Sequence, residues 1–459
     1  MKNISLLTLI IAATVAFADN ENYDGQDVSG QNFNGSFINS SWNGANASGA
    51  FFDGDFTNSS WVGANATGAY FWDIELTNAN FTNANLTRAD FGENCYYGKY
   101  NVLASVNFTN AIITYANLYD TGFTKEQLYS TKSYQDKDVR GIIFCYNDLT
   151  DCDFSGQNLT GACIYDGTPI SNANFTDAII TKTSFGCLTP MGFTKEQLYS
   201  TKSYKDKYLV GVELYENNMS GWDFSGQNLT SANFYNATLT NANFSFADLR
   251  GADMTASSGE PIYKATIMPD GVIRNFAMTS GTDELVIRKY TPATPSGANI
   301  TAKIADAATL TGGARLTLEQ GAELEILENA SLTVGANSQV KIITDSGNPT
   351  PLTIAENAEL TLDDGAILSV NAVGAFVEGG FYTFKLLEWK DSSTIQGLEN
   401  LIKGVSLLFT VNGVPFAGDW DSVLGANYFA ISATIPEPAA FDALFGICAF
   451  VFAACRRRK

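Results

Sequence analysis

The sequence predicts an all-β chain built from two consecutive repetitive β-structures, and three observations lead to this fold class. Apolar residues recur every five positions through much of the first half, and a strand-and-turn unit recurs every eight positions in the second. Neither period fits a helix, which repeats about every 3.6 residues, or a single strand, which repeats every second residue. The chain is 45% apolar with 31 Phe and 20 Tyr, a composition that excludes disorder as its main state.

The five-residue period is clearest between residues 209 and 254. A small residue precedes most of the apolar ones by two positions, as in Ala232-Asn233-Phe234. If each block forms one short extended side and one corner, both residues face inward, and the block must stack on copies of itself to bury them. The apolar positions of this run are Leu209, Leu214, Met219, Phe224, Leu229, Phe234, Leu239, Phe244, Leu249 and Met254. Shorter runs are Phe71, Leu76, Phe81, Leu86 and Phe91; Leu103, Phe108, Ile113 and Leu118; and Leu149, Phe154, Leu159 and Ile164.

This A(D/N)LXX pattern resembles the pentapeptide-repeat family over most of residues 28–255. The resemblance implies a right-handed quadrilateral β-helix with four blocks, about twenty residues, in each coil. Phe at many apolar positions is expected to stack along the inner face. The pattern is weaker between Phe33 and Val62, where Trp42, Trp61 and the pair Phe51-Phe52 disturb the spacing.

A nearly identical segment interrupts the ladder twice, near 122–137 and near 192–207. Thr124 with Gln127, and Thr194 with Gln197, fit the capping box that begins a helix, so each segment predicts a short helical insert. We expect each helix to pack on the open end of one β-helix segment and to cover its edge strand. A partner-binding role for the inserts is the alternative.

The eight-residue period begins after residue 255 and predicts a second β-solenoid-like domain over 256–433. Ala314 to Leu318, Ala322 to Ile326 and Ala330 to Val334 alternate apolar and polar residues, and Gly or Asn precedes the next unit. These repeats resemble the passenger regions of autotransporter-type surface proteins. Longer strands are expected at 381–387, 407–411 and 428–433, where they would form a cap on the solenoid.

The first 18 residues have the three parts of a secretory signal peptide. Lys2 supplies the positive start, an apolar run extends from Ile4 to about Val15, and Ala16-Phe17-Ala18 is a small-x-small cleavage site. Cleavage after Ala18 would leave an exported chain that begins near Asp19. The predicted pentapeptide-repeat domain then covers residues 19–255.

The last segment, 434–459, predicts a hydrophobic sorting tail. Pro436-Glu437-Pro438 precedes an apolar stretch from Ala439 to Ala454, and Arg456, Arg457, Arg458 and Lys459 follow. The basic end should stay cytoplasmic by the positive-inside rule, and a simple permanent anchor is one interpretation. The order of these features resembles the PEP-CTERM sorting signal of Gram-negative bacteria. That resemblance implies an exosortase-type transpeptidase as partner, transient anchoring in the inner membrane, and release to the cell surface, outer envelope or extracellular matrix.

The residue inventory argues against catalysis. The chain has no histidine, which excludes Ser-His-Asp and Cys-His catalysis and histidine metal sites. Paired carboxylates remain as candidates for polysaccharide cleavage, but most Asp residues of the first half occupy the repeat position just before an apolar residue. Those residues are Asp90, Asp148, Asp153, Asp223 and Asp248. We therefore predict no enzyme activity, no cofactor and no metal site.

Five cysteines lie between the two terminal segments, and none forms a CxxC motif. Export would permit disulfides, but the pairing stays open, and we expect most of these residues to occupy wall positions. They are Cys95, Cys145, Cys152, Cys163 and Cys187.

Three functions follow from these patterns. The leading hypothesis is a secreted, non-catalytic structural or adhesive protein of the cell envelope or extracellular matrix. The alternative is a carbohydrate-binding or polysaccharide-degrading β-helix, with exopolysaccharide as partner, in which Trp42, Trp61, Tyr70 and Trp72 stack on sugars; otherwise these rings cap the end of the coil stack. A third hypothesis is an acidic DNA mimic, because some pentapeptide-repeat proteins inhibit DNA gyrase. The formal charge of -21 argues against nucleic acid as a direct partner.

Overall fold

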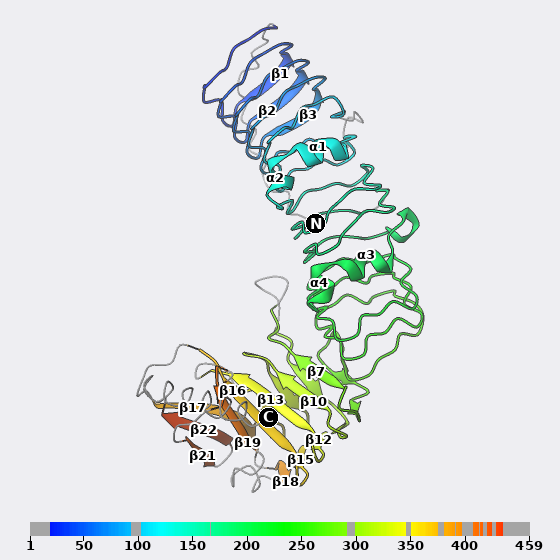
Figure 1. Ribbon diagram of the computed structural model, residues 1–459, viewed down its shortest axis with the longest axis vertical. Coiled ribbons are helices and arrows are strands. Elements are labelled where there is room, and N and C mark those ends of the chain that lie inside the picture. Colours follow the sequence, from blue (N-terminus) through cyan, green and yellow to red (C-terminus); the bar gives the residue numbers. More distant parts are fainter. Residues whose placement is uncertain are drawn as a thin grey trace, which may run out of the picture. The chain divides into compact units, whose positions relative to one another are not determined.

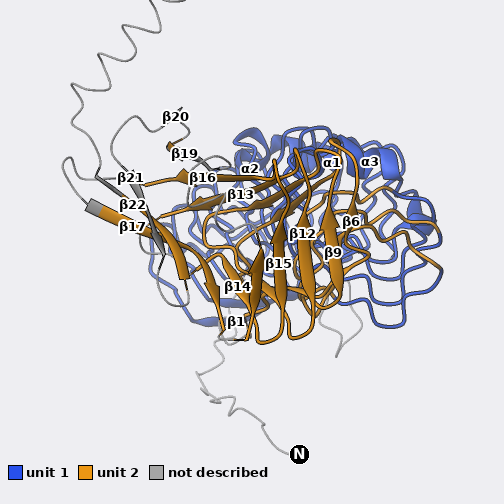
Figure 2. Ribbon diagram, turned by 90° about the horizontal axis from the view of Figure 1, so that it is seen from below, with its two compact units in different colours: residues 1–222, 232–240, 253–259 blue, residues 223–231, 241–252, 260–459 orange. Residues whose placement is uncertain are grey.

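A computed structural model describes residues 19–92, 102–165, 167–291, 299–345, 350–374, 381–390, 392–396, 407–412, 414–415, 420–424 and 428–434. The chain divides into two compact units (Figures 1 and 2). Unit 1 comprises residues 1–222, 232–240 and 253–259, and unit 2 comprises residues 223–231, 241–252 and 260–459. Both units consist of stacked coils of short parallel strands, so the all-β fold class is confirmed.

Each coil of unit 1 has four sides, and the central residue of each side points inward, usually with a small buried residue two positions before it. Residues on adjacent coils pair in parallel, and longer strands form where one side is most extended: β1 (Asn32–Ser36), β2 (Phe51–Asp55) and β3 (Tyr70–Glu75). One coil contributes Phe33, Phe37, Trp42 and Ala47 to the core, and the next contributes Phe52, Phe56, Trp61 and Ala66. The stack therefore buries apolar side chains that no single coil could bury alone.

The corners explain why Gly and Asn separate the apolar residues. In one corner the Ala45 N–H donates to the Trp42 carbonyl at 3.1 Å, and Gly44 between them has φ of 64°. The corresponding residue of another corner, Asn39, has φ of 57°. Gly and Asn adopt this left-handed conformation at the lowest cost.

Coil length varies, although the five-residue period implies a constant twenty. Asp27 and Asn46 stack at a spacing of 19 residues, and Asn58 and Asn78 at a spacing of 20. The spacing rises to 27 between Asn80 and Asn107, where the chain includes residues 93–101 outside the described part. Coils of 19 residues contain one four-residue side, such as that from Phe33 to Phe37. The region that looked irregular in the sequence is therefore a regular part of the stack.

Each insert forms two short helices. The first contains α1 (Lys125–Ser130) and α2 (Lys132–Gln135), and the second contains α3 (Lys195–Ser200) and α4 (Lys202–Lys205), preceded by the 3-10 helix η1 (Thr189–Met191). Both predicted capping boxes are present, one between Thr124 and Gln127 and one between Thr194 and Gln197.

The helices stand within the wall of the stack, so the expectation that they cover an open end is wrong. Toward the preceding coil, the Gln127 Nε2 donates to the carbonyls of Leu103 and Val106 at 2.6 and 2.7 Å. Toward the following coil, the Asp153 N–H donates to the Tyr129 hydroxyl at 2.6 Å. Figure 1 shows coils on both sides of α1 and α2. The backbone N–H groups of a helix bond within the helix, so they are not available to the neighbouring coil. The Gln127 side-chain amide supplies the donors that the N–H groups of a strand would have supplied.

Unit 2 contains three sheets that form the faces of a second solenoid. β10, β11 and β12 follow one another onto three different sheets, and β13 returns to the sheet of β10, where Gln339 pairs with Arg315. Three eight-residue units therefore make one three-sided coil. The first sheet contains β7 (Glu284–Ile287), β10 (Arg315–Leu318), β13 (Gln339–Thr344), β16 (Ile367–Ala372), β19 (Leu407–Val411) and β20 (Val414–Pro415). The second contains β8 (Ala302–Ile304), β11 (Leu324–Ile326), β14 (Leu352–Ile354), β17 (Phe381–Trp389), β22 (Tyr428–Thr434) and β21 (Trp420–Leu424). The third contains β6 (Ala277–Met278), β9 (Ala307–Leu310), β12 (Ser331–Val334), β15 (Glu359–Leu362) and β18 (Thr394–Gln396).

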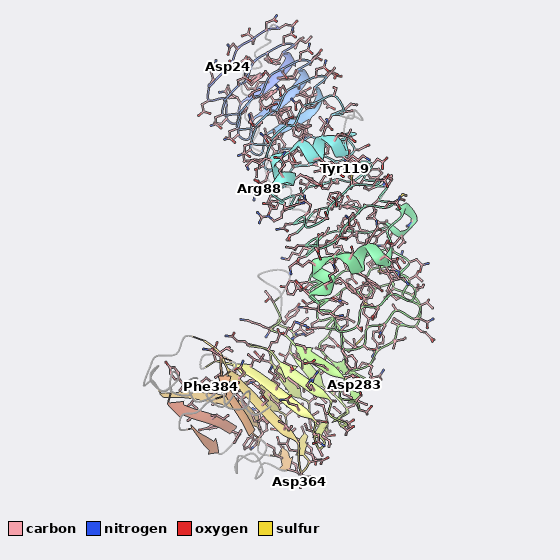
Figure 3. The ribbon with its side chains drawn as sticks, in the orientation of Figure 1. Asp24, Arg88, Tyr119, Asp283, Asp364 and Phe384 are labelled. Carbon is pink, nitrogen blue, oxygen red and sulfur yellow. The ribbon has the colours of Figure 1, made fainter. Side chains whose placement is uncertain are left out.

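The start and the end of this solenoid depart from parallel pairing. β4 (Thr266–Ile267) and β5 (Ile273–Arg274) form an antiparallel pair before the first full coil. At the far end β17 pairs with β22, and β22 with β21, in antiparallel fashion. Phe384 of β17 is buried with Phe429 and Ile431 of β22 (Figure 3 labels Phe384). The three longer strands expected at this end are present as β17, β19 and β22. β17 and β19 pair in parallel with β14 and β16, and the antiparallel pairs of β17 with β22 and of β19 with β20 close the stack.

Candidate functional site

The residues of the predicted export and sorting signals lie outside the described part of the chain. These are Ala16 and Ala18 at the first end, and Pro436, Glu437, Pro438, Arg456, Arg457, Arg458 and Lys459 at the other. Within the described residues, no helix has the length and apolar character needed to cross a bilayer.

Two of the four aromatic residues proposed for sugar stacking are core residues. Trp42 and Trp61 are both 0% exposed, and the indole N–H of each donates at 2.8 Å to a serine hydroxyl, that of Ser40 and that of Ser59. The expectation that these two rings contact sugars is wrong, and so is the alternative that they cap the stack. Each is the inward residue of its side, with a coil above and a coil below it.

The other two aromatic residues lie on the outer face of β2 and β3, where Phe51 joins them. Tyr70 is 41% exposed, and its ring centroid lies 5.1 Å from that of Trp72. Trp72 in turn lies 5.4 Å from Phe51, with the rings perpendicular. We call Phe51, Tyr70 and Trp72 the aromatic face. Phe51 and Tyr70 each precede an inward residue and pair across adjacent coils, so knowledge of the 19-residue coil would have revealed the cluster.

Carboxylates border the aromatic face. The Trp72 indole donates to Asp90, whose Oδ1 also accepts from the Gly92 N–H at 3.0 Å and from the Asn117 amide at 2.7 Å. Burial raises the pKa of Asp90 despite these hydrogen bonds, which act in the opposite direction. The Trp72 ring is therefore held in place by a polar network that continues onto the neighbouring coils.

Asp73 marks a β-bulge beside the same face. The pairing of β2 with β3 shifts register here, and Asp73 has φ of 51°. Within the described residues no donor contacts the buried Asp73 Oδ1. Bulges and unsatisfied buried polar atoms are both enriched at functional sites, and here they coincide with the exposed aromatic rings.

The ladder carboxylates have architectural roles. Asp148, Asp153 and Asp223 each accept from the backbone N–H two residues further on, at 2.9, 3.0 and 3.0 Å. Asn residues at the same position make the same contact, as Asn85 does with the Thr87 N–H at 3.1 Å. These side chains close their own turns. Among the described residues, no group of three or more His, Cys, Asp or Glu is arranged to hold a metal ion.

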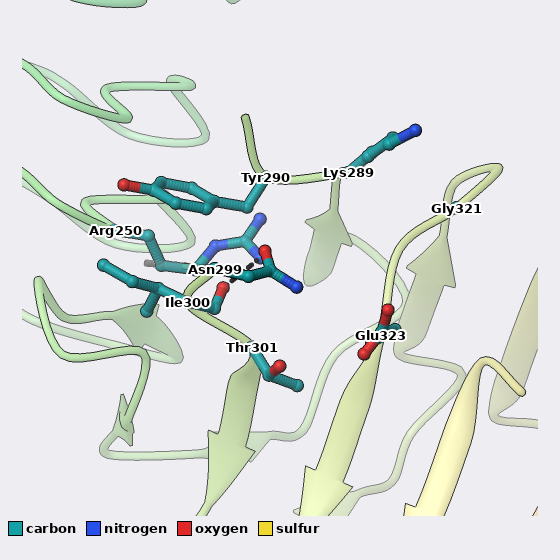
Figure 4. A pocket seen from close by; sticks show the side chains of 8 residues that line it. All are labelled: Arg250, Lys289, Tyr290, Asn299, Ile300, Thr301, Gly321 and Glu323. Carbon is teal, nitrogen blue, oxygen red and sulfur yellow. Dashed lines mark hydrogen bonds between the residues drawn. The ribbon is translucent and has the colours of Figure 1, made fainter. Parts of the chain in front are cut away.

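Unit 2 contains a cavity of about 220 Å³ beside Arg250 (Figure 4). Arg250 and Asp248 form an ion pair at 2.6 Å in which both side chains are 1% exposed. The guanidinium also donates to the carbonyls of Arg288 and Ile300, at 2.6 and 3.1 Å, and lies 5.5 Å from the Tyr290 ring centroid. These contacts use the charge of Arg250 to hold the two backbone segments, so it is not available to a ligand. The cavity is lined by Arg250, Lys289, Tyr290, Asn299, Ile300, Thr301, Gly321 and Glu323.

Comparisons with known proteins find the repeat in this chain. The family model described as pentapeptide repeats matches eight copies, in residues 55–93 and 218–255. Among solved structures, the pentapeptide repeat protein HetL of the cyanobacterium Nostoc sp. strain PCC 7120, involved in heterocyst differentiation regulation, is 21% identical. That match covers 56% of this chain and 89% of HetL, with a TM-score of 0.14. Full-length QnrB1, a plasmid-mediated fluoroquinolone resistance protein, is 15% identical over 47% of this chain and 92% of its own, with a TM-score of 0.20. No curated protein matches the chain. The two segments matched by the family model are therefore pentapeptide repeats, as the five-residue period predicted.

Proposed function

We propose that this chain is a non-catalytic structural or adhesive protein, exported and displayed on the envelope or in the extracellular matrix of a Gram-negative bacterium. The observation that carries the proposal is the use of the ladder residues. Their apolar side chains fill the core, and carboxylates such as Asp148 and Asp153 are engaged by their own turns. A stack built in this way is a stiff spacer with a polar surface.

Catalysis is the first property to test. Purified chain carrying residues 19–434 should not depolymerise exopolysaccharide of the native host, as measured by the release of reducing ends. Cleavage that survives replacement of exposed carboxylates would point to a contaminant. Cleavage lost with one carboxylate would overturn the proposal.

Export and sorting form the second part of the proposal. Intact mass spectrometry of cell-surface protein should give a chain that begins near Asp19 and ends near Pro436 to Pro438. A variant with Pro436, Glu437 and Pro438 changed to Ala keeps the apolar span and should accumulate at full tail length in the inner membrane. Deletion of residues 456–459 should instead weaken membrane retention, because it removes the cytoplasmic charges. Recovery of mature surface protein that still ends at Lys459 would show a permanent anchor.

A second candidate function is carbohydrate binding at the aromatic face. It is favoured by the exposure of Tyr70, the perpendicular packing of Trp72 on Phe51, and the carboxylates beside them. Sugar rings bind aromatic faces through their C–H surfaces and bind carboxylates through their hydroxyls. The Tyr70→Ala and Trp72→Ala variants should lose binding on a glycan array, whereas Tyr235→Ala, which removes a tyrosine that is 45% exposed elsewhere in unit 1, should retain it. Equal binding by all three variants would remove this candidate.

We propose no nucleic-acid partner, because a formal charge of -21 repels phosphate groups. An acidic DNA mimic would instead use the same negative charge to bind a DNA-binding protein in place of DNA. A DNA gyrase supercoiling assay separates the two: we expect no inhibition by residues 19–434, and inhibition at low protein concentration would establish the mimic.

A further inference from the structure

Cys145 and Cys163 meet on neighbouring coils of unit 1. Cys145 directly follows the inward residue Phe144, and Cys163 directly precedes the inward residue Ile164. The Phe144 N–H donates to the Cys163 carbonyl at 2.9 Å, which sets the two coils in register. The Cys145 thiol lies 3.5 Å from the same carbonyl oxygen, and the two thiol side chains are in hydrogen-bond contact with one another.

The same two positions bring side chains together elsewhere in the stack. One residue follows the inward residue of a coil, and its partner precedes the inward residue of the next coil. At these positions the Ser41 hydroxyl lies 2.6 Å from Asp24 Oδ1, and the Ser60 hydroxyl lies 2.7 Å from Asn43 Oδ1. The Asn107 amide lies 3.1 Å from the Thr82 hydroxyl in the same way. The direct contact is therefore a property of the repeat geometry, and it places two thiols together wherever both positions are cysteine.

We propose that Cys145 and Cys163 form a disulfide that links two adjacent coils of the stack. All four described cysteines are thiols in the structure. The other two are placed differently. Cys152 is a buried inward residue at the small position, and the Cys187 thiol lies 3.4 Å from Glu216 Oε2. The repeat therefore selects one pair among the four.

The linkage forms by thiol–disulfide exchange with a small disulfide. One cysteine thiolate attacks a sulfur of the small disulfide and releases one thiol, and the second cysteine then displaces the other. Two cysteine thiols and one small disulfide thus become one protein disulfide and two small thiols. The hydrogen bond with Cys145 is the main cause that raises the pKa of Cys163, and burial of the thiol raises it further. Because the thiolate is the attacking species, we expect slow oxidation of the folded chain at neutral pH and faster oxidation as the pH rises.

The pairing is tested on the full chain treated with oxidised glutathione. Remaining thiols are alkylated with N-ethylmaleimide under denaturing conditions, and the digested protein is examined by mass spectrometry. The expected product is a peptide pair joined through Cys145 and Cys163, lighter than the two reduced peptides by two hydrogens, with Cys152 alkylated. Alkylation of both Cys145 and Cys163 after prolonged oxidation at raised pH, or their linkage to other cysteines, would overturn the proposal.

A stability measurement separates the linkage from the packing of the two side chains. The disulfide closes a loop between residues that are 18 positions apart, so it should raise the melting temperature of unit 1 by roughly 6–12 °C. Oxidised wild type should exceed a Cys145→Ser/Cys163→Ser double variant by this amount, and the difference should shrink when both are reduced. The matched control Cys152→Ala should keep the redox-dependent shift. A shift of the same size in the double variant would show that another cysteine pair is responsible, and would contradict the proposal.

Discussion

Trp61 stacks on Trp42 in the core of unit 1, with ring centroids 4.8 Å apart and ring planes within 3° of parallel. Tyr23 continues the column on one side, 4.0 Å from Trp42, and Phe81 continues it on the other, 5.5 Å from Trp61. The perpendicular contact of Phe52 with both indoles, at 5.3 and 4.9 Å, ties this column to the adjacent inner side. The first coils are therefore held by an aromatic core that extends through successive layers.

The first prediction concerns this column. Trp61→Ala should lower the free energy of unfolding of the first stack by about 3–5 kcal/mol, because it leaves a cavity between two coils. It also removes the indole partner of the buried Ser59 hydroxyl. Denaturant unfolding followed by tryptophan fluorescence and circular dichroism measures the change. Tyr235→Ala, which removes an aromatic side chain that is 45% exposed elsewhere in unit 1, is the matched control and should cost about 1 kcal/mol or less; equal losses would contradict the assignment of Trp61 to the core.

The second prediction concerns the donors that the helical insert supplies. Gln127→Leu keeps most of the side-chain volume but leaves the buried Leu103 and Val106 carbonyls without the amide donor. We expect a loss of about 2–4 kcal/mol, with faster amide hydrogen exchange across α1 and the coil beneath it. Gln135→Leu removes an exposed amide that donates to the Ser130 carbonyl at 3.2 Å, and it should cost less than about 0.5 kcal/mol. If the two variants lose the same free energy of unfolding, the inserts do not support the neighbouring coil, and the prediction is wrong.

The five-residue period predicts positions such as Phe224 and Leu229 well, because every side in that region has five residues and one inward centre. It fails at Trp42 and Trp61, because a four-residue side shifts the phase of the ladder once in each 19-residue coil. The architectural role of Asp148 and Asp153 follows from position alone, since each contacts the backbone two residues ahead.

Most contacts between coils could not be predicted from the sequence. The aromatic face depends on which residues stack across coils, and coil length varies between 19 and 29 residues in the described part of unit 1. The Arg250 guanidinium contacts the carbonyl of Ile300, 50 residues away, and nothing local in the sequence distinguishes Arg250 from an exposed corner residue. For Cys145 and Cys163 the sequence does contain a signal, because their separation of 18 residues is two less than a coil of twenty. At that separation, the residue that follows one inward residue lies against the residue that precedes the inward residue of the next coil.

The third prediction concerns the buried ion pair. Arg250→Met should destabilise unit 2 by about 3–5 kcal/mol, because it leaves the Asp248 carboxylate buried without its partner. It also removes the donors to the Arg288 and Ile300 carbonyls. Adding Asp248→Leu should recover part of the loss, since the uncompensated charge is then gone. Urea unfolding measures both effects.

The exposed pair of Lys202 and Asp206 is the control for this prediction, with side chains 54% and 51% exposed. Lys202→Met should change stability by no more than about 0.5 kcal/mol. A double variant no more stable than Arg250→Met alone would show that the hydrogen bonds to the carbonyls, and not the unpaired charge, dominate the loss.

The last prediction is a pH dependence centred on Asp90. Burial raises its pKa above the ordinary value of 3.8, outweighing hydrogen bonds from Gly92, Trp72 and Asn117. A carboxylate with a raised pKa binds its proton more tightly in the folded chain, so its ionised form costs stability at every pH above the folded pKa. Below 3.8 it is protonated in both states, and the cost disappears. Asp90→Asn should therefore raise the melting temperature at about pH 7, and the gain should vanish at about pH 3. Asp138→Asn is the matched control of opposite sign, because the hydrogen bond from Arg140 lowers the pKa of Asp138 and ionisation there stabilises the fold. Melting curves of both variants and the wild type across this pH range decide the matter, and a loss of stability in Asp90→Asn at about pH 7 would mean that its hydrogen bonds outweigh its burial.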